Sequence, residues 1–211
     1  ARLLADAGAD AVELNLYSVN TSPDESSSAV EDRYLRIISM VRAQIEVPLA
    51  VKLSQHITGL SSFARRAEDA GANGLVLFNR FYGAEVDLDA LAMTSRLALS
   101  NPEELRFPLR WIGILRAQRP GLSLAATTGV HSGLDAVKAL LVGADVACTT
   151  SAVLQHGTGW VGRMLAELGT WLTDHDYDSV RQLQGSMSAD NVSDPAAFER
   201  AQYMKVITSQ I

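Results

Sequence analysis

Residues 142–151 read VGADVACTTS and join a helix end, a short apolar run and a polar turn. Glycine at such a position ends a helix in the left-handed conformation, and the following aspartate suits a tight turn. The apolar run has the composition of a buried strand in a parallel sheet, covered on both faces. Similar phrases recur as AGAD at 7–10 and AGAN at 70–73, each followed by an apolar run. The recurrence predicts helices alternating with strands.

Two further runs, PLAVKL at 48–53 and LSLAA at 122–126, fit the same rhythm. Strands that alternate with helices form a parallel sheet with right-handed crossovers. The strands are expected at Val12–Leu16, Leu49–Leu53, Gly74–Phe78, Leu122–Ala126 and Val146–Thr149. The helices are expected at Val30–Gln44, Ser61–Ala70, Pro102–Gln118, Leu134–Val142 and Gly159–Thr173, with a short one at Ala152–Gln155.

Every predicted strand ends in polar residues, which favours an α/β fold of the (β/α)8 TIM barrel type. A barrel gathers its functional groups at the C-terminal ends of several strands, whereas a doubly wound sheet concentrates them at one switch point. A barrel typically takes about 250 residues. We therefore expect residues 1–211 to form a single domain that carries about the last five βα units. The N-terminal units, roughly 100 residues on the same scaling, are expected to be absent.

Composition excludes several function classes. The formal net charge is −6, which argues against binding to nucleic acid or to anionic membrane surfaces. No apolar run is long enough to span a membrane, and no signal peptide is visible, so a cytoplasmic location is expected. Cys148 is the single cysteine, and its apolar surroundings predict a small buried side chain. The histidines show no metal-ligand spacing, so no metal is expected; they are His56, His131, His156 and His175.

Two consecutive loops point to a phosphate site. Thr128-Gly129-Val130 follows one predicted strand, and Thr150-Ser151 follows the next and precedes the short helix. In barrels, the loops after the last two strands and a short extra helix bind phosphate through backbone N–H groups. Ordinary turn chemistry is the alternative for either loop alone. Two such loops in the expected places favour phosphate binding.

Lys52 lies in VKLS at 51–54, near the end of an apolar strand. A lysine that points inward from a buried strand needs an anionic partner. The partner is either a ligand or Glu13 on the neighbouring strand. We favour the ligand, because Lys52 comes one βα unit after Asn15 at the same edge of the sheet.

Three amides and one hydroxyl are further candidates. Asn15 and Asn79 follow equivalent phrases on different strands, and Asn20 lies in the loop after the first. Amides offer both donors and an acceptor to a planar polar substrate, although Asn20 also suits a loop turn. Ser18 can relay a proton if a partner activates it, and otherwise it is a turn residue.

With these residues in view, the chain resembles the dihydroorotate dehydrogenase family, and most closely its dihydroorotate dehydrogenase-like branch. The resemblance covers nearly the whole chain. Its most specific parts are ELNLYSVN (13–20), VKLS (51–54), GLVLFNR (74–80), AATTGVHSG (125–133), GADVACTTSAVLQHG (143–157), GSMS (185–188) and DPAAFERAQYMK (194–205).

The resemblance implies an FMN-binding (β/α)8 barrel that oxidises dihydroorotate to orotate in pyrimidine biosynthesis. Asn15, Ser18 and Asn20 match the family motif N-x-S-[CS]-P-N, which makes Ser18 the proton acceptor and the two amides substrate ligands. Lys52 matches the lysine that contacts the flavin, and Asn79 matches the substrate-binding asparagine after the sixth strand. The resemblance also makes a homodimer possible. The phosphate loops correspond to Thr128, Gly129, Val130, Thr150 and Ser151.

Some positions depart from the family pattern. Tyr17 and Val19 replace the usual Ser and Pro, and Tyr17 is bulky enough to narrow a substrate pocket. Thr128 and Thr150 each replace a glycine, and the usual glycine-rich segment reads LALSNPEEL at 97–105. Two alternatives therefore stay open. One is a flavin-free lyase or isomerase that acts on a phosphorylated substrate, with Lys52 as a Schiff base; the other is a non-catalytic barrel that serves as a binding module.

Overall fold

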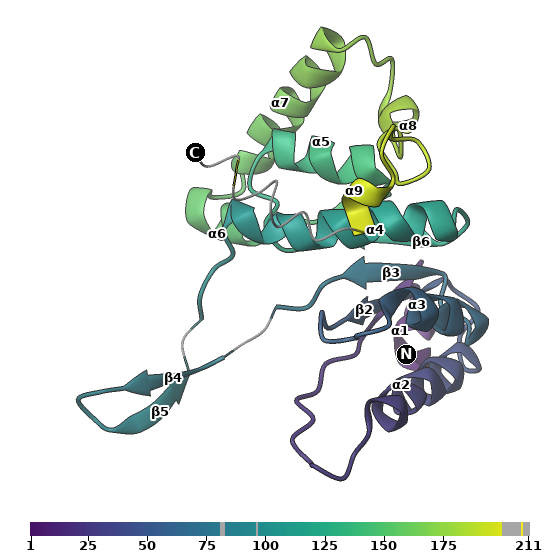
Figure 1. Ribbon diagram of the computed structural model, residues 1–211, viewed down its shortest axis with the longest axis vertical. Coiled ribbons are helices and arrows are strands. Elements are labelled where there is room, and N and C mark those ends of the chain that lie inside the picture. The colour runs from purple at the N-terminus through teal and green to yellow at the C-terminus, as the bar shows by residue number, and fades with distance from the viewer. Residues whose placement is uncertain (81–82, 96, 200–207, 209–211) are drawn as a thin grey trace.

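The computed structural model describes the chain except residues 81–82, 96, 200–207 and 209–211, so residues 200–205 of DPAAFERAQYMK lie outside it. Helices and strands alternate through most of its length (Figure 1). The helices are α1 (Arg2–Asp6), α2 (Ser27–Arg42), α3 (Leu60–Asp69), η1 (Pro102–Leu105, a 3-10 turn), α4 (Arg106–Gln118), α5 (Gly133–Val142), α6 (Ser151–His156), α7 (Trp160–Asp174), α8 (Val180–Leu183) and α9 (Ala196–Glu199). The strands are β1 (Val12–Asn15), β2 (Leu49–Leu53), β3 (Gly74–Leu77), β4 (Ala84–Asp87), β5 (Ala92–Ser95), β6 (Ser123–Ala126) and β7 (Val146–Ala147).

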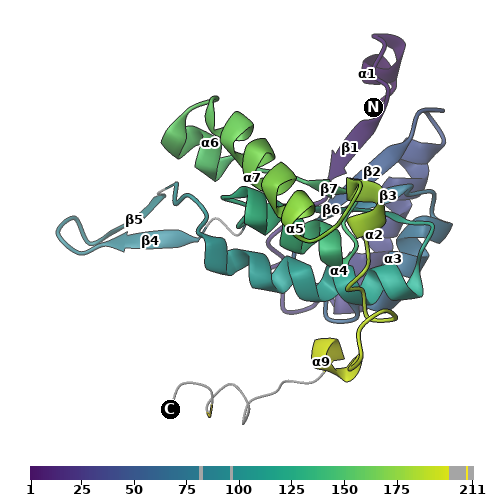
Figure 2. The same cartoon turned by 90° about the horizontal axis from the view of Figure 1, so that it is seen from above.

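Five strands form one parallel sheet in the order β1-β2-β3-β6-β7. The order follows the chain without a reversal, whereas a doubly wound sheet reverses at its switch point. Each helix packs on the next, α2 on α3, α3 on α4 and α4 on α5, as a single outer layer requires (Figure 2). The fold is therefore mixed α/β with the winding of part of a (β/α) barrel, and its sheet stays open, with β1 and β7 at the edges.

The recurring Gly-Ala-Asp/Asn phrase closes the helices as the sequence predicts. Gly71 and Gly143 have φ of 107° and 115°, in the left-handed region. The polar residue does more than serve a turn, because it reaches the neighbouring strand. Asn73 Oδ1 accepts the backbone N–H of Leu49 at 2.9 Å, and Asp145 Oδ2 accepts that of Leu124 at 2.7 Å. The phrases at 70–73 and 142–145 thus tie the starts of neighbouring strands together.

The core lies between the sheet and the helices. In β2 the side chains of Leu49, Val51 and Leu53 are fully buried against the helices, and Lys52 points to the opposite, half-buried face. Of the five strands, β3 alone is buried at every position. The prediction that the strands are covered on both faces is therefore wrong for β1, β2, β6 and β7. An open sheet leaves its inner face without strands opposite.

The predicted boundaries agree with the structure to within a few residues. The helix expected at Pro102–Gln118 begins as the 3-10 turn η1 and becomes α4 only at Arg106. α2 begins earlier than expected, at Ser27, where the Ser26 side chain accepts the N–H of Ala29. The β4–β5 hairpin was not predicted, and in both views it projects away from the rest of the molecule (Figures 1 and 2). All of its strand positions are exposed, so it lacks the buried apolar run that signals a strand.

Candidate functional site

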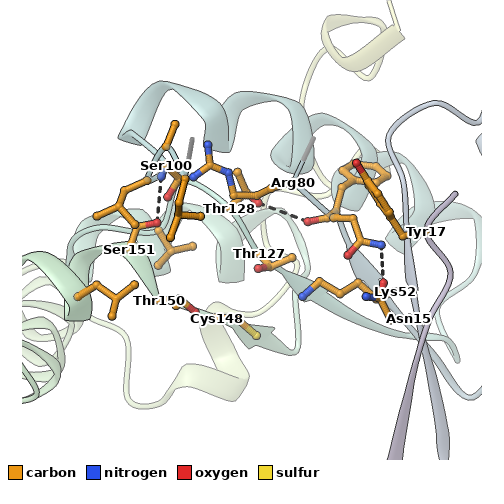
Figure 3. Close-up of a pocket in the computed structure, with 18 residues that line it drawn as sticks. Asn15, Tyr17, Lys52, Arg80, Ser100, Thr127, Thr128, Cys148, Thr150 and Ser151 are labelled. Atoms are coloured by element: carbon orange, nitrogen blue, oxygen red, sulfur yellow. Dashed lines mark hydrogen bonds between the residues drawn. The ribbon is translucent and has the colours of Figure 1, made fainter. Parts of the chain in front are cut away.

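A cavity of about 390 Å³ lies where the strands of the parallel sheet end. Its wall combines amides, hydroxyls and two cations with apolar side chains (Figure 3). Its lining is Asn15, Tyr17, Lys52, Phe78, Asn79, Arg80, Leu97, Ala98, Leu99, Ser100, Thr127, Thr128, Gly129, Val130, Cys148, Thr150, Ser151 and Leu154. Most of the residues selected from the sequence thus meet in one space, together with the bulky Tyr17.

The ends of β1, β2 and β3 supply one side of this cavity. Asn15 pairs with Lys52 in the strand register, so both reach the same edge. The Asn79 amide donates to Asn15 Oδ1 at 2.7 Å and to the Leu16 carbonyl at 3.3 Å. Lys52 Nζ is 3.8 Å from Glu13 Oε1. This separation is at the long end for an ion pair, so the ammonium can also serve a ligand.

The loop after β6 brings backbone close to the cavity. Thr128 and Gly129 are consecutive left-handed residues, with φ of 77° and 83°. This conformation is costly for a β-branched residue, and strained backbone of this kind gathers at binding sites. The Thr128 hydroxyl donates to the Phe78 carbonyl at 3.3 Å. A Cβ on Gly129 would stand 2.3 Å from the backbone nitrogen of Leu105, so this position admits only glycine.

The loop after β7 is tied to the loop after β6 and to the segment before η1. The Thr149 hydroxyl donates to the Val130 carbonyl at 2.8 Å. Ser151, which begins α6, accepts the backbone N–H of Ser100 on its hydroxyl oxygen at 2.9 Å. Ser100 in turn lies 3.0 Å from His131 Nε2. The two loops selected from the sequence therefore form one connected wall with 97–100.

Asp135 fixes the end of the loop after β6. Its Oδ2 accepts the backbone N–H groups of His131 and Ser132, both at 3.1 Å, and its Oδ1 lies 3.0 Å from Lys138 Nζ. Burial alone would raise the pKa of this carboxyl, but hydrogen bonds from Lys138, Ser132 and His131 outweigh burial, so the pKa is lowered. The carboxylate form is thus built into the loop.

We expect Asp135→Asn to lower the free energy of unfolding at pH 7 by about 2 kcal/mol, the scale of hydrogen bonds to a charged group. Because the folded pKa is lowered, the stabilisation is fully present above the ordinary aspartate pKa of about 3.9 and is lost as the pH falls through the folded pKa. Melting temperatures of both proteins from pH 7 to pH 3 should therefore converge at the acid end. Asp69→Asn alters an exposed ion pair with Arg65, and its melting temperature should follow that of the unaltered protein in parallel across this pH range. A melting curve for Asp135→Asn that also ran parallel to the unaltered protein would contradict the prediction.

Ser18 and Asn20 do not reach this cavity, contrary to the single site expected from the sequence. They line a separate cavity of about 200 Å³ with Glu25, Tyr34 and His56 among others. Ser18 Oγ lies 2.6 Å from the Tyr34 hydroxyl on α2, and Asn20 Oδ1 accepts from Arg33 at 2.7 Å. The loop after β1 turns outward to α2. The short separation of Asn15, Ser18 and Asn20 in the sequence does not reveal this turn.

Cys148 and Arg80 line the cavity although neither was selected as a site residue. Cys148 is half-buried and lies beyond the end of β7, so the expectation of a small buried side chain is wrong. Burial, and then the charge of Glu13, raise the pKa of its thiol, while Lys52 acts in the opposite direction. Arg80 directly follows Asn79 at the end of β3; a charged residue at a strand end was the signal that could have found it.

Within the described part of the chain, no cluster of His, Cys, Asp or Glu side chains could hold a metal ion. None of its helices is long and apolar enough to cross a membrane.

Comparison with known proteins identifies relatives. The Dihydroorotate dehydrogenase family profile matches residues 1–172. "Dihydroorotate dehydrogenase A (fumarate)" of Limosilactobacillus reuteri is 30% identical over 66% of this chain and 46% of its own length. "Dihydroorotate dehydrogenase B (NAD(+)), catalytic subunit" of Geobacter sp. strain M21 is 28% identical over 89% of this chain and 62% of its own.

A third relative is named for the oxidation of a dihydropyrimidine. "Dihydropyrimidine dehydrogenase (NADP(+)), chloroplastic" of Arabidopsis thaliana is 23% identical over 84% of this chain and 46% of its own length. The chain spans about half of the length of these curated relatives. The profile match covers most of the chain, and the sequential parallel sheet agrees with it. The chain therefore belongs to the dihydroorotate dehydrogenase family.

Proposed function

We propose that this protein is an FMN-dependent oxidoreductase that oxidises a dihydropyrimidine, with dihydroorotate as the first substrate to test. The observation that carries the proposal is the single cavity shared by Asn15, Lys52 and Asn79 and by the loops at 127–130 and 150–151. The names of the relatives, dihydroorotate dehydrogenases and a dihydropyrimidine dehydrogenase, support the same reaction class.

The donor set of the cavity fits FMN. The volume of about 390 Å³ lies within the ordinary range of ligand pockets. The loops at 127–130 and 150–151 would hold the phosphate through backbone N–H groups and hydroxyls. Leu97, Leu99 and Phe78 offer apolar surface to a planar ring, and Lys52 offers a positive charge. When bound, FMN would supply the hydride acceptor.

The chain's own residues would bind the substrate and move one proton. The overall change removes a proton from one ring carbon and a hydride from its neighbour, which leaves a C=C bond. Asn15 and Asn79 would hold the polar edge of the ring, and Lys52 would favour negative charge beside it. Ser18 is the proposed proton acceptor and Asn20 a further substrate ligand. Both roles require the loop after β1 to turn from the Tyr34 and Arg33 contacts toward the cavity.

The decisive measurement is the absorbance spectrum of the purified full chain. We expect flavin bands, FMN released on denaturation, and bleaching of the bands when dihydroorotate is added without oxygen. The same experiment with dihydrouracil compares a ring that lacks the carboxylate. Flavin binding without bleaching by either compound would contradict the proposed substrate class.

A colourless protein that binds no added FMN would overturn the cofactor assignment. Covalent trapping of a carbonyl substrate on Lys52 by borohydride would then identify the flavin-free lyase or isomerase. Lys52 lies 3.8 Å from Glu13, so its side chain is available either to contact a flavin or to form a Schiff base. The absorbance spectrum distinguishes these two functions.

A further inference from the structure

The cavity is positively charged on two sides. Among its described lining residues the charged side chains are Lys52 and Arg80, and no carboxylate is present. Lys52 shares its edge with Asn15. Figure 3 shows Arg80 between Thr128 and Ser100, with its head group turned toward Ser100, while Lys52 and Asn15 lie toward the other end. The two cations therefore lie at different parts of the cavity.

A chain of hydrogen bonds ties Arg80 to the phosphate loops. Arg80 Nη2 lies 3.4 Å from Glu104 Oε1. That oxygen also accepts the backbone N–H of Asn101 at 3.2 Å and its amide at 3.1 Å. Asn101 follows Ser100, whose N–H donates to Ser151 Oγ. The guanidinium is thus held on the same wall of the cavity as the loop at 150–151.

The Glu104 carboxylate makes two kinds of contact, one within η1 and one with Arg80. The carboxylate completes the capping box that starts η1, where Asn101 Oδ1 accepts the N–H of Glu103 at 3.0 Å. Its contact with Arg80 is a single one of 3.4 Å, longer than the roughly 2.7–2.9 Å of a strong charge-assisted hydrogen bond. Glu104 therefore positions the Arg80 guanidinium and leaves N–H donors of that group available for a ligand.

We propose that Arg80 is the cationic partner of the monophosphate group bound in this cavity, and that Glu104 holds its guanidinium in place while competing weakly with that anion. The inference rests on the proposed function, since FMN is the monophosphate in question. A phosphate monoester carries about −1.5 to −2 charges at neutral pH. Backbone N–H groups of the two loops donate hydrogen bonds but carry no net charge. The planar fork of arginine suits two phosphate oxygens at once.

The test compares FMN with riboflavin, which lacks the phosphate, by fluorescence quenching on the full chain. Arg80→Gln should weaken FMN binding about tenfold or more, the scale of a charge-assisted hydrogen bond, and leave riboflavin binding unchanged. Arg110→Gln is the matched control, because Arg110 is exposed on α4 and outside the lining. Circular dichroism of each variant checks that it is folded.

Glu104→Gln is a second variant, and it should change FMN affinity in the opposite direction. Glutamine keeps the capping box and removes the competing charge, so FMN binding should tighten about threefold while riboflavin binding stays the same. When Glu104→Gln is added to Arg80→Gln, most of this gain in FMN affinity should disappear, because the two residues act on the same anion.

Three results overturn the inference. Equal weakening of FMN and riboflavin by Arg80→Gln would show a structural role. Unchanged FMN affinity with a raised KM for dihydroorotate would assign Arg80 to the substrate carboxylate and leave the proposed function standing. Failure of the unaltered chain to bind FMN and riboflavin would overturn both proposals.

Discussion

Gly129→Ala is expected to lower the free energy of unfolding by about 3 kcal/mol, from left-handed strain and steric overlap together. Gly129 has φ of 83°, where an alanine is strained. Its added Cβ would stand 2.3 Å from the backbone nitrogen of Leu105 and 2.8 Å from its Cα. Backbone cannot rotate away as a side chain does, so the loop after β6 or the end of η1 must move. Urea unfolding of the two proteins measures the difference.

Gly185→Ala separates the two causes. Gly185 has a similar φ of 74°, but the nearest atom to an added Cβ is 3.7 Å away, at ordinary contact distance. We expect this variant to lose only about 1 kcal/mol from left-handed strain. Equal losses for the two variants would show that the close approach of Leu105 contributes nothing. Because Gly129 lines the cavity, its variant should also lose FMN affinity, whereas the Gly185 variant should retain it.

Lys52→Met is expected to slow flavin reduction by dihydroorotate by a factor on the order of 100 to 1,000, the scale of losing one preorganised electrostatic contact. Methionine preserves most of the stem, which matters because the lysine side chain is only 27% exposed, and it removes the positive charge. Stopped-flow measurement of flavin bleaching without oxygen gives the rate, and FMN titration shows whether binding survives.

Arg65→Met is the control for Lys52→Met, because it also replaces a cation by methionine. Arg65 is 57% exposed on α3 and does not line the cavity, so its variant should reduce flavin at the rate of the unaltered protein. If Lys52→Met retains FMN and the full rate, Lys52 has no part in the reaction. Its pair with Glu13 would then be purely structural.

The strands and their order were within reach of the sequence because local chemistry decides them. The glycines of the Gly-Ala-Asp/Asn phrases end helices, and the short apolar runs that follow them are typical of strands in a covered parallel sheet. The β2 boundaries Leu49–Leu53 were predicted without error. By contrast, the β4–β5 hairpin is exposed along both strands, so no burial pattern marks it.

The resemblance to the family also predicted the loops at 127–130 and 150–151 and Lys52 as neighbours, and the structure places them around one cavity. It did not anticipate that Ser18 and Asn20 would be held away from it. Their positions depend on Tyr34 and Arg33, which come from a helix that begins beyond the loop. A motif fixes which side chains are present, but packing against α2 decides where the loop after β1 points.

By itself, the sequence determined the alternating parallel architecture, the polar edge where the strands end and the chemical groups available there. These follow from periodicity and turn chemistry, which act over a few residues. Only the tertiary structure decided that Cys148 lines the cavity, that Leu105 leaves no room for a side chain at Gly129, and that Glu104 contacts Arg80 near the loops at 127–130 and 150–151. Each of these depends on segments far apart in the chain approaching within a few ångströms, and no local pattern encodes such an approach.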